Sequence, residues 1–241
     1  MDTIFLITIL VVIFALAFDF INGFHDTANA IATSVSTRAL KPRVAVLMAA
    51  IMNFVGALTF VGVAKAIASN IVDPMSLNAF EGDVTGSVVI LAALCSAITW
   101  NLLTWYYGIP SSSSHTLIGS LAGAAIGAAG FSILNYDGFL NILAALILSP
   151  ILALTVGFIV MSLFKIFFRN LGLYKTNSRF RLVQILTAAV QSFTHGTNDA
   201  QKAMGIITMA LIASGLQTGD EVQGGVRIAC ATAMGLGTSV G

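Results

Sequence analysis

The sequence predicts an all-α polytopic membrane protein, and three observations carry this prediction. The 241 residues are 57% hydrophobic and only 9% charged, with a mean hydropathy of +0.95, whereas a soluble domain carries roughly 25% charged residues. The apolar residues gather in long uncharged runs of about 20, the length at which a helix crosses a bilayer. These runs lack the alternation of a barrel strand, so the spans are expected to be helices.

Seven apolar runs are candidate spans. They cover residues 3–20, 44–66, 85–108, 115–134, 139–168, 182–214 and 226–241. The N-terminus lacks the positive segment that opens a signal peptide, so we expect the first run to be retained. Cys95 and Cys230 lie within apolar runs, without the spacing of a disulfide or a metal site, and are expected to be core residues.

Basic residues gather in two connections, which predicts the orientation. Eight of the 11 Lys and Arg residues lie between the first two spans or around the connection 169–181. They are Arg38, Lys41, Arg43, Lys165, Arg169, Lys175, Arg179 and Arg181. Because cytoplasmic connections collect Lys and Arg, we expect a multi-pass inner-membrane protein with its N-terminus outside and 169–181 in the cytoplasm. The net charge of +1 offers no basic excess for nucleic acid.

A polar motif near the N-terminus recurs late in the chain at a constant offset. Residues 22–30 resemble residues 195–203, with Gly, Asp and Ala matching in place, and residues 43–56 resemble 227–240. Because five expected spans precede the basic connection, the second copy enters the membrane from the opposite side, which predicts an inverted-repeat secondary transporter. We therefore expect a first repeat over 1–168, a basic cytoplasmic connection over 169–181 and the start of an inverted second repeat over 182–241.

Each copy of the motif places polar side chains on one stripe of a helix, three or four residues apart. The first stripe is Asp19, Asn22, Asp26, Asn29 and Thr33, and the second is Ser192, His195, Asp199 and Lys202. Charged groups at bilayer depth are costly unless they face a partner or water, so they are functional candidates. Carboxylate, amide and carbonyl oxygens suit a hard cation such as Na⁺, whereas H⁺ needs only one carboxylate.

Structural interpretations of the same residues remain open. Buried Asp and Asn side chains also hold helices together by hydrogen bonds. For Asp19, near the expected membrane edge, a structural role and a functional role weigh equally. Lys202 fits neutralisation of Asp199, three residues away, as well as it fits contact with the substrate. Gly23 and Gly196 weaken the helix inside each motif, so we expect broken or re-entrant helices whose carbonyls face a bound ion.

A second polar constellation lies between the third and fourth spans, at Pro110, Ser111, Ser112, Ser113, Ser114, His115 and Thr116. Pro followed by Ser before an apolar run predicts a helix start. The free N–H groups of a helix start, with several hydroxyls beside them, suit a tetrahedral anion; an ordinary polar turn with an N-cap is the alternative. His25, His115 and His195 lack the spacing of a metal site and are expected to be hydrogen-bonding residues.

At these residues the chain resembles the inorganic phosphate transporter (PiT) family, cation-coupled symporters whose two inverted halves each carry a Gly-x-Asn-Asp-like signature. Residues 22–30 are similar to the first signature, residues 196–202 to the second, and residues 110–116 to the Pro-Ser-x-x-His hairpin of the first half. The resemblance covers essentially all 241 residues. His25 stands where many members have Asn, and Asn53 where some eukaryotic members have Glu.

The resemblance implies cation coupling by Asp26 and Asp199 with the help of Asn29 and Asn198, and Asn22 shares their stripe. It implies phosphate binding by Ser112, Ser113 and Ser114, to which we add Ser111, Thr116 and Lys202. The family's second half has a further hairpin that these residues do not reach, so we expect a truncated second repeat. Unless the natural protein continues, we expect no complete alternating-access site.

The leading hypothesis is therefore a secondary transporter that imports inorganic phosphate by symport with Na⁺, or less readily H⁺. Such a transporter needs the bilayer and the coupling ion but no further cofactor, and it is compatible with a homodimer. A sulfate symporter of the same fold is one alternative. A non-transporting membrane subunit or fragment is another, and it predicts that Asp26→Asn leaves all activity intact. An intramembrane hydrolase is disfavoured, because Ser114 and His115 are adjacent on one turn and point in different directions.

Overall fold

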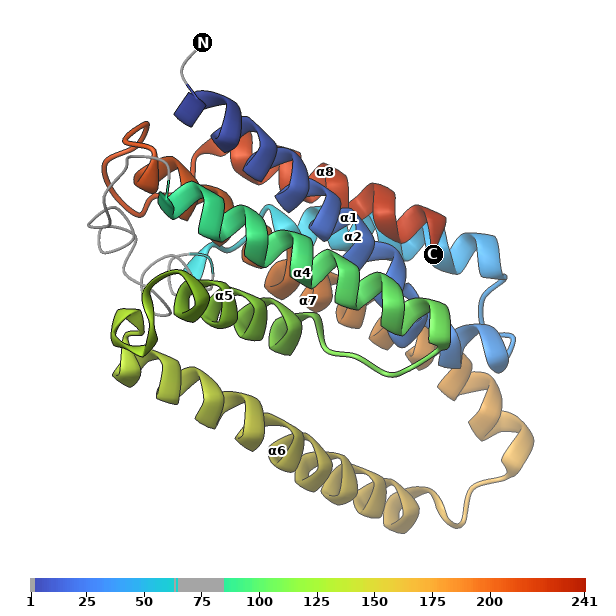
Figure 1. Cartoon of the computed structure of the whole chain (residues 1–241). Helices are drawn as coiled ribbons and strands as arrows, with labels where there is room; N and C mark the ends of the chain where they lie inside the picture. Colours follow the sequence, from blue (N-terminus) through green and yellow to red (C-terminus); the bar gives the residue numbers. More distant parts are fainter. Residues whose placement is uncertain (1–2, 63, 65–84) are drawn as a thin grey trace.

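The chain forms a bundle of long helices (Figure 1), and the computed structural model describes residues 3–62, 64 and 85–241. The described elements are α1 (Thr3–Ser36), α2 (Pro42–Ala57), α4 (Thr85–Tyr107), α5 (Ser113–Ala129), the short 3-10 helix η2 (Phe131–Ile133), α6 (Tyr136–Phe168), α7 (Leu173–Ala213) and α8 (Gly224–Val240). The prediction of an all-α protein is confirmed. Three helices within these ranges are long and apolar enough to cross a membrane, at Thr3–Ser36, Gly86–Tyr107 and Tyr136–Phe168.

Each of the seven expected spans falls on a helix, although the end of the second span, at residues 63, 65 and 66, lies outside the described residues. Two helices run well beyond the apolar runs. α1 continues to Ser36 and α7 begins at Leu173, so both polar motifs lie inside helices. Most of the expected connection 169–181 is therefore the first part of α7.

Local chemistry sets several helix ends. Pro42 opens α2, where its missing N–H costs nothing and its fixed φ suits a helix. Ser112 caps α5 by accepting a hydrogen bond from the His115 N–H, and Asn135 caps α6 by accepting from the Gly138 N–H at 3.2 Å. Both caps satisfy donors that the first turn of a helix leaves free.

The middle of the bundle consists of the four helices α1, α2, α7 and α8. α1 packs against α7 and α8, while α2 packs against the same two helices from the other side. α1 and α7 run in opposite directions along the bundle (Figure 1), as an inverted repeat requires. Side chains such as Phe18, Leu94, Leu121 and Ile206 are fully buried where α4 and α5 pack onto this unit.

The two motif glycines lie at close helix crossings. A Cβ at Gly196 would come within 2.1 Å of the Asn53 carbonyl oxygen on α2, and one at Gly23 within 2.6 Å of the Met234 oxygen on α8. α1 and α7 continue through these positions, so the expected helix breaks are wrong in this structure. Glycine is present because neighbouring backbones approach closely, as in small-residue packing of membrane helices.

The crossings also correct the expected register of the repeat. Gly237 meets the backbone of Phe20, and Gly56 meets the backbone of Phe193. Phe20 and Phe193 are related by the same offset as the two polar motifs. The crossings thus make Gly56 equivalent to Gly237, whereas the alignment of residues 43–56 with 227–240 makes it equivalent to Val240. The register of α2 and α8 therefore differs from the expected one by about one helical turn.

The helices α4, α5 and α6 form the other side of the bundle (Figure 1). The segment 108–112 leads back along α4, so that α5 begins beside the middle of α4 and the Ser120 hydroxyl donates to Ser96 at 3.3 Å. α6, all of whose residues are described, forms the outer edge and has no buried residue. Its apolar surface is suited to hydrocarbon, where a helix satisfies its own backbone groups.

Candidate functional site

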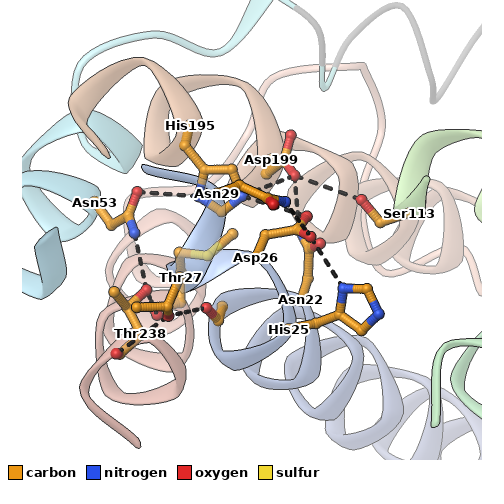
Figure 2. A network of polar contacts seen from close by, with 12 residues as sticks. Asn22, His25, Asp26, Thr27, Asn29, Asn53, Ser113, His195, Asp199 and Thr238 are labelled. Carbon is orange, nitrogen blue, oxygen red and sulfur yellow. Dashed lines mark hydrogen bonds and ion pairs between the residues drawn. The ribbon is translucent and has the colours of Figure 1, made fainter. Parts of the chain in front are cut away.

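Two carboxylates from α1 and α7 meet in the centre of the bundle. Asp26 and Asp199 face each other across the imidazole of His195, and the donor atoms of the three residues lie within 4.8 Å of one another. Figure 2 shows these side chains pointing into one polar network between the helices. The side chains of Asp26 and Asp199 are only 14% and 15% exposed. The fold therefore brings together the equivalent acidic groups of the two motifs, which are far apart in the sequence.

Each carboxylate contacts residues of its own helix and of the opposite helix, and two contacts of each carboxylate correspond between the two motifs. On its own helix, Asp26 accepts a hydrogen bond from Asn29 at 3.2 Å, and Asp199 pairs with Lys202 at 3.0 Å. Across the interface, Asp199 accepts from the Asn22 amide at 2.9 Å, while His195 Nε2 lies 3.6 Å from Asp26. These four partners occupy corresponding positions of the two motifs.

His195 is fixed by a chain of polar contacts that reaches α8. Its Nδ1 lies 3.1 Å from the Asn53 side-chain oxygen, and the Asn53 amide donates to the Thr238 hydroxyl at 2.8 Å. The other ring nitrogen lies 3.3 Å from Asp199. A metal-binding imidazole is commonly oriented by such a contact to its second nitrogen. His195, Asp26 and Asp199 together form a donor set that suits a cation.

Lys202 joins this cluster to the start of α5. The Lys202 ammonium, on a residue only 5% exposed, donates to the Ser113 hydroxyl at 2.8 Å as well as pairing with Asp199. Ser113 in turn lies 3.5 Å from Asp199. The helix start expected to bind an anion therefore touches the expected cation site.

Among the residues that the structure describes, the cluster contains buried acceptors that lack a hydrogen-bond donor. Asp19 is fully buried, and neither of its carboxylate oxygens has a hydrogen-bond partner; the side-chain oxygen of Asn22 also lacks one. Asp19 lies on the same stripe of α1 as Asn22 and Asp26. A buried acceptor without a donor is costly, so this arrangement favours a bound cation.

Most of the remaining hairpin residues line a hollow on the other side of α5, between α5 and α4. Its volume is about 530 Å³. The lining residues are Ser96, Trp100, Pro110, Ser111, Ser112, His115, Thr116, Gly119 and Ser120. Three of the six residues expected to bind phosphate, Ser111, Ser112 and Thr116, therefore line one hollow at a helix start. Ser113 points instead to Lys202, and Figure 2 shows its contact with Asp199.

The other residues of the polar motifs do not all lie in the site. Asn198 is exposed on α7, away from the contacts that hold Asp199, and Ser114 is partly buried without lining the hollow. His25 contacts Asp26 at 3.0 Å.

Asn53 was not expected in the site from the sequence, and His195 was expected on the second polar stripe as a hydrogen-bonding residue but not beside both carboxylates. His195 occupies in the second motif the position that Asn22 occupies in the first, and this correspondence was the signal for it. The contact of Asn53 with His195 depends on the crossing of α2 and α7, for which the sequence carried no signal.

Comparison with known proteins places the chain in a family. The model of the phosphate transporter family matches residues 22–175 and 171–241. A probable low-affinity inorganic phosphate transporter of Bacillus subtilis is 66% identical over 242 residues, which is 100% of this chain and 71% of that protein. A low-affinity inorganic phosphate transporter of Escherichia coli is 36% identical over 231 residues, covering 86% of this chain and 46% of the relative.

A solved structure shares the fold. The sodium-dependent phosphate transporter superimposes with a TM-score of 0.81 at 23% sequence identity, over 96% of this chain and 74% of that one. The relatives are longer than this chain, which spans between about half and three quarters of them. These relatives are transporters and not enzymes. The chain belongs to the phosphate transporter family and is a membrane protein.

Proposed function

We propose that this chain imports inorganic phosphate by symport with a cation, Na⁺ rather than H⁺, through alternating access. The observation that carries the proposal is the contact between two opposite kinds of site. A buried cluster rich in carboxylates adjoins the hydroxyl-rich start of α5 through Ser113 and Lys202. Family membership supports phosphate as the substrate, and a sodium-dependent phosphate transporter has this fold.

The cation preference follows from the oxygen atoms in the cluster. The carboxylates of Asp26 and Asp199 lie within 4.8 Å of each other and of His195, Lys202 is paired with Asp199, and Asp19 is a further buried acid on the stripe of Asp26. Unpaired oxygens of Asp19 and Asn22 add acceptors but no donors. Hard cations take several oxygen ligands, so Na⁺ uses more of this set than one proton does.

Coupling then follows from electrostatics. An anion brought to the start of α5 meets the negative cluster behind Ser113, and a bound cation lowers that repulsion. Neither ion is stable alone at this depth, so occupancy by both is favoured. The pair shifts the protein between outward-open and inward-open states by no more than its differential affinity for them.

For the topology, we propose an N-terminus outside the inner membrane and the 169–181 segment in the cytoplasm. Residues 1–168 would then form the first repeat, and residues 182–241 would begin an inverted second repeat. The helix crossings at Phe20 on α1 and Phe193 on α7 are related by the same sequence offset as the two polar motifs, which supports this division.

Radiolabelled phosphate uptake into proteoliposomes, with and without an inward Na⁺ gradient, tests the proposal. We expect Na⁺-dependent uptake that Asp26→Asn abolishes and that excess unlabelled sulfate leaves intact. Inhibition by sulfate would indicate the sulfate symporter instead. Uptake unchanged in Asp26→Asn would contradict a coupling role for the cluster.

A further inference from the structure

The two carboxylates at the centre of the bundle have corresponding partners, with one difference in charge. Three residues after Asp26 stands Asn29, a neutral amide, and three residues after Asp199 stands Lys202, an ammonium. Both reach back to the carboxylate on their own helix, at 3.2 Å and 3.0 Å. The same position of the motif therefore supplies a neutral donor to one acid and a full positive charge to the other.

The contacts across the interface do not remove this difference. Asp199 receives the amide of Asn22, and Asp26 faces the imidazole of His195, which also lies 3.3 Å from Asp199. Within the described residues, Lys202 is the only Lys or Arg in an ion pair with either carboxylate. Asp199 has a counter-charge belonging to the chain, whereas Asp26 has none that is permanent.

We propose that Lys202 is a tethered cation that occupies the place of a coupling ion at Asp199, so that only the rest of the cluster takes up free Na⁺. This inference rests on the proposed function and specifies its coupling. An ammonium with three donors can satisfy Asp199 and Ser113 together, and Lys202 does so at 3.0 Å and 2.8 Å. A free cation at Asp199 would have to share that space with a fixed charge of the same sign.

The position of Lys202 also links the tethered charge to the substrate. Ser113 is the first residue of α5, next to the cap residue Ser112 that lines the polar hollow. A positive charge at this point lowers the cost of placing an anion at the helix start. Lys202 thus supplies in every state a charge that a coupling ion would otherwise bring in, and the number of Na⁺ ions bound per chain is reduced by one.

Equilibrium ²²Na⁺ binding to the purified chain tests the inference. The test variant is Lys202→Asn, which gives the second motif the residue of the first, and the matched control is Lys202→Arg, which keeps the charge. We expect Lys202→Asn to bind about one more Na⁺ per chain than the wild type, and Lys202→Arg to bind the same number as the wild type. If the additional ion binds cooperatively with the others, the Hill coefficient rises as well, since its limit is the number of sites.

The outcomes separate this inference from the proposed function. Wild-type binding that depends on Asp26, with no additional ion in Lys202→Asn, overturns the tethered-cation inference and leaves Na⁺ coupling intact. Absence of binding in the wild type with one ion in Lys202→Asn supports the inference and contradicts Na⁺ coupling. Equal absence of binding in both proteins overturns both.

A reciprocal variant covers the case in which Lys202→Asn does not fold. Asn29→Lys places an ammonium beside Asp26, and we expect it to bind about one Na⁺ fewer than the wild type. Asn29→Gln is its control, because it keeps a neutral amide at a similar length. Unchanged Na⁺ binding in Asn29→Lys overturns the inference, because a tethered charge would then not replace a free cation in this cluster.

Discussion

Gly196 on α7 offers the sharpest test of the central packing. A Cβ at this position would lie 2.1 Å from the Asn53 carbonyl oxygen and 2.5 Å from the Asn53 Cα, whereas ordinary contacts begin at 3.4 Å. Both neighbours are backbone atoms, so α2 and α7 must separate to accommodate Gly196→Ala. Overpacking of this kind costs about 1–3 kcal/mol.

Separation of α2 from α7 would also disturb the candidate site. The contact between His195 and Asn53, at 3.1 Å, and the hydrogen bond from Thr197 to the Gly56 oxygen, at 3.2 Å, both cross this interface. We expect Gly196→Ala to lower the free energy of unfolding by about 1–3 kcal/mol. At 2–4 °C per kcal/mol for a chain of this size, Tm falls by roughly 2–12 °C.

The assay is thermal unfolding of the purified protein in detergent, with Gly123→Ala on α5 as the control. A Cβ at Gly123 meets no atom within 4 Å, and Ala in a helix is favoured over Gly by roughly 0.5–1 kcal/mol. The control should therefore keep or slightly raise Tm. Equal Tm values for the two variants would refute the described crossing of α2 and α7.

Three further predictions concern the site. Ser112→Ala removes the cap of α5, which should lower the free energy of unfolding by about 1 kcal/mol and raise the KM for phosphate in uptake assays. An unchanged KM would show that phosphate does not bind in the hollow that Ser112 lines. Asn53→Leu leaves Thr238 and the His195 ring without their partner, and thermal unfolding should show a loss of about 1–3 kcal/mol. Asp26→Glu keeps the charge but displaces the oxygens, so the Na⁺ concentration for half-maximal uptake should rise. A wild-type Na⁺ concentration for half-maximal uptake in Asp26→Asn would contradict the role of that charge.

The sequence was sufficient to predict the helices, because a continuous apolar run must satisfy its backbone internally in a membrane. It was also sufficient to predict that Asp26 and Asp199 belong to equivalent motifs. It did not show that α1 and α7 stay helical through Gly23 and Gly196. A glycine in a helix is compatible with a break or with a close crossing, and only the position of the neighbouring helix distinguishes them.

The candidate site was predictable to the extent that it follows the stripes of single helices. The contacts of Asn53 and Thr238 with each other depend on the register of α2 against α8, which sequence similarity placed about one turn away. The separation of Ser113 from Ser111 and Ser112 also required the structure. Neighbouring residues at the start of a helix point in different directions, and only the packing of α5 shows which of them meets Lys202.

Coupling of Na⁺ to phosphate through the central cluster is tested most directly by ²²Na⁺ entry into proteoliposomes driven by an inward phosphate gradient, with equal Na⁺ on both sides. Because coupling of two binding equilibria is reciprocal, we expect phosphate to drive ²²Na⁺ accumulation in the wild type and not in Asp26→Asn. Phosphate entry without accompanying ²²Na⁺ would contradict symport with Na⁺ through this cluster.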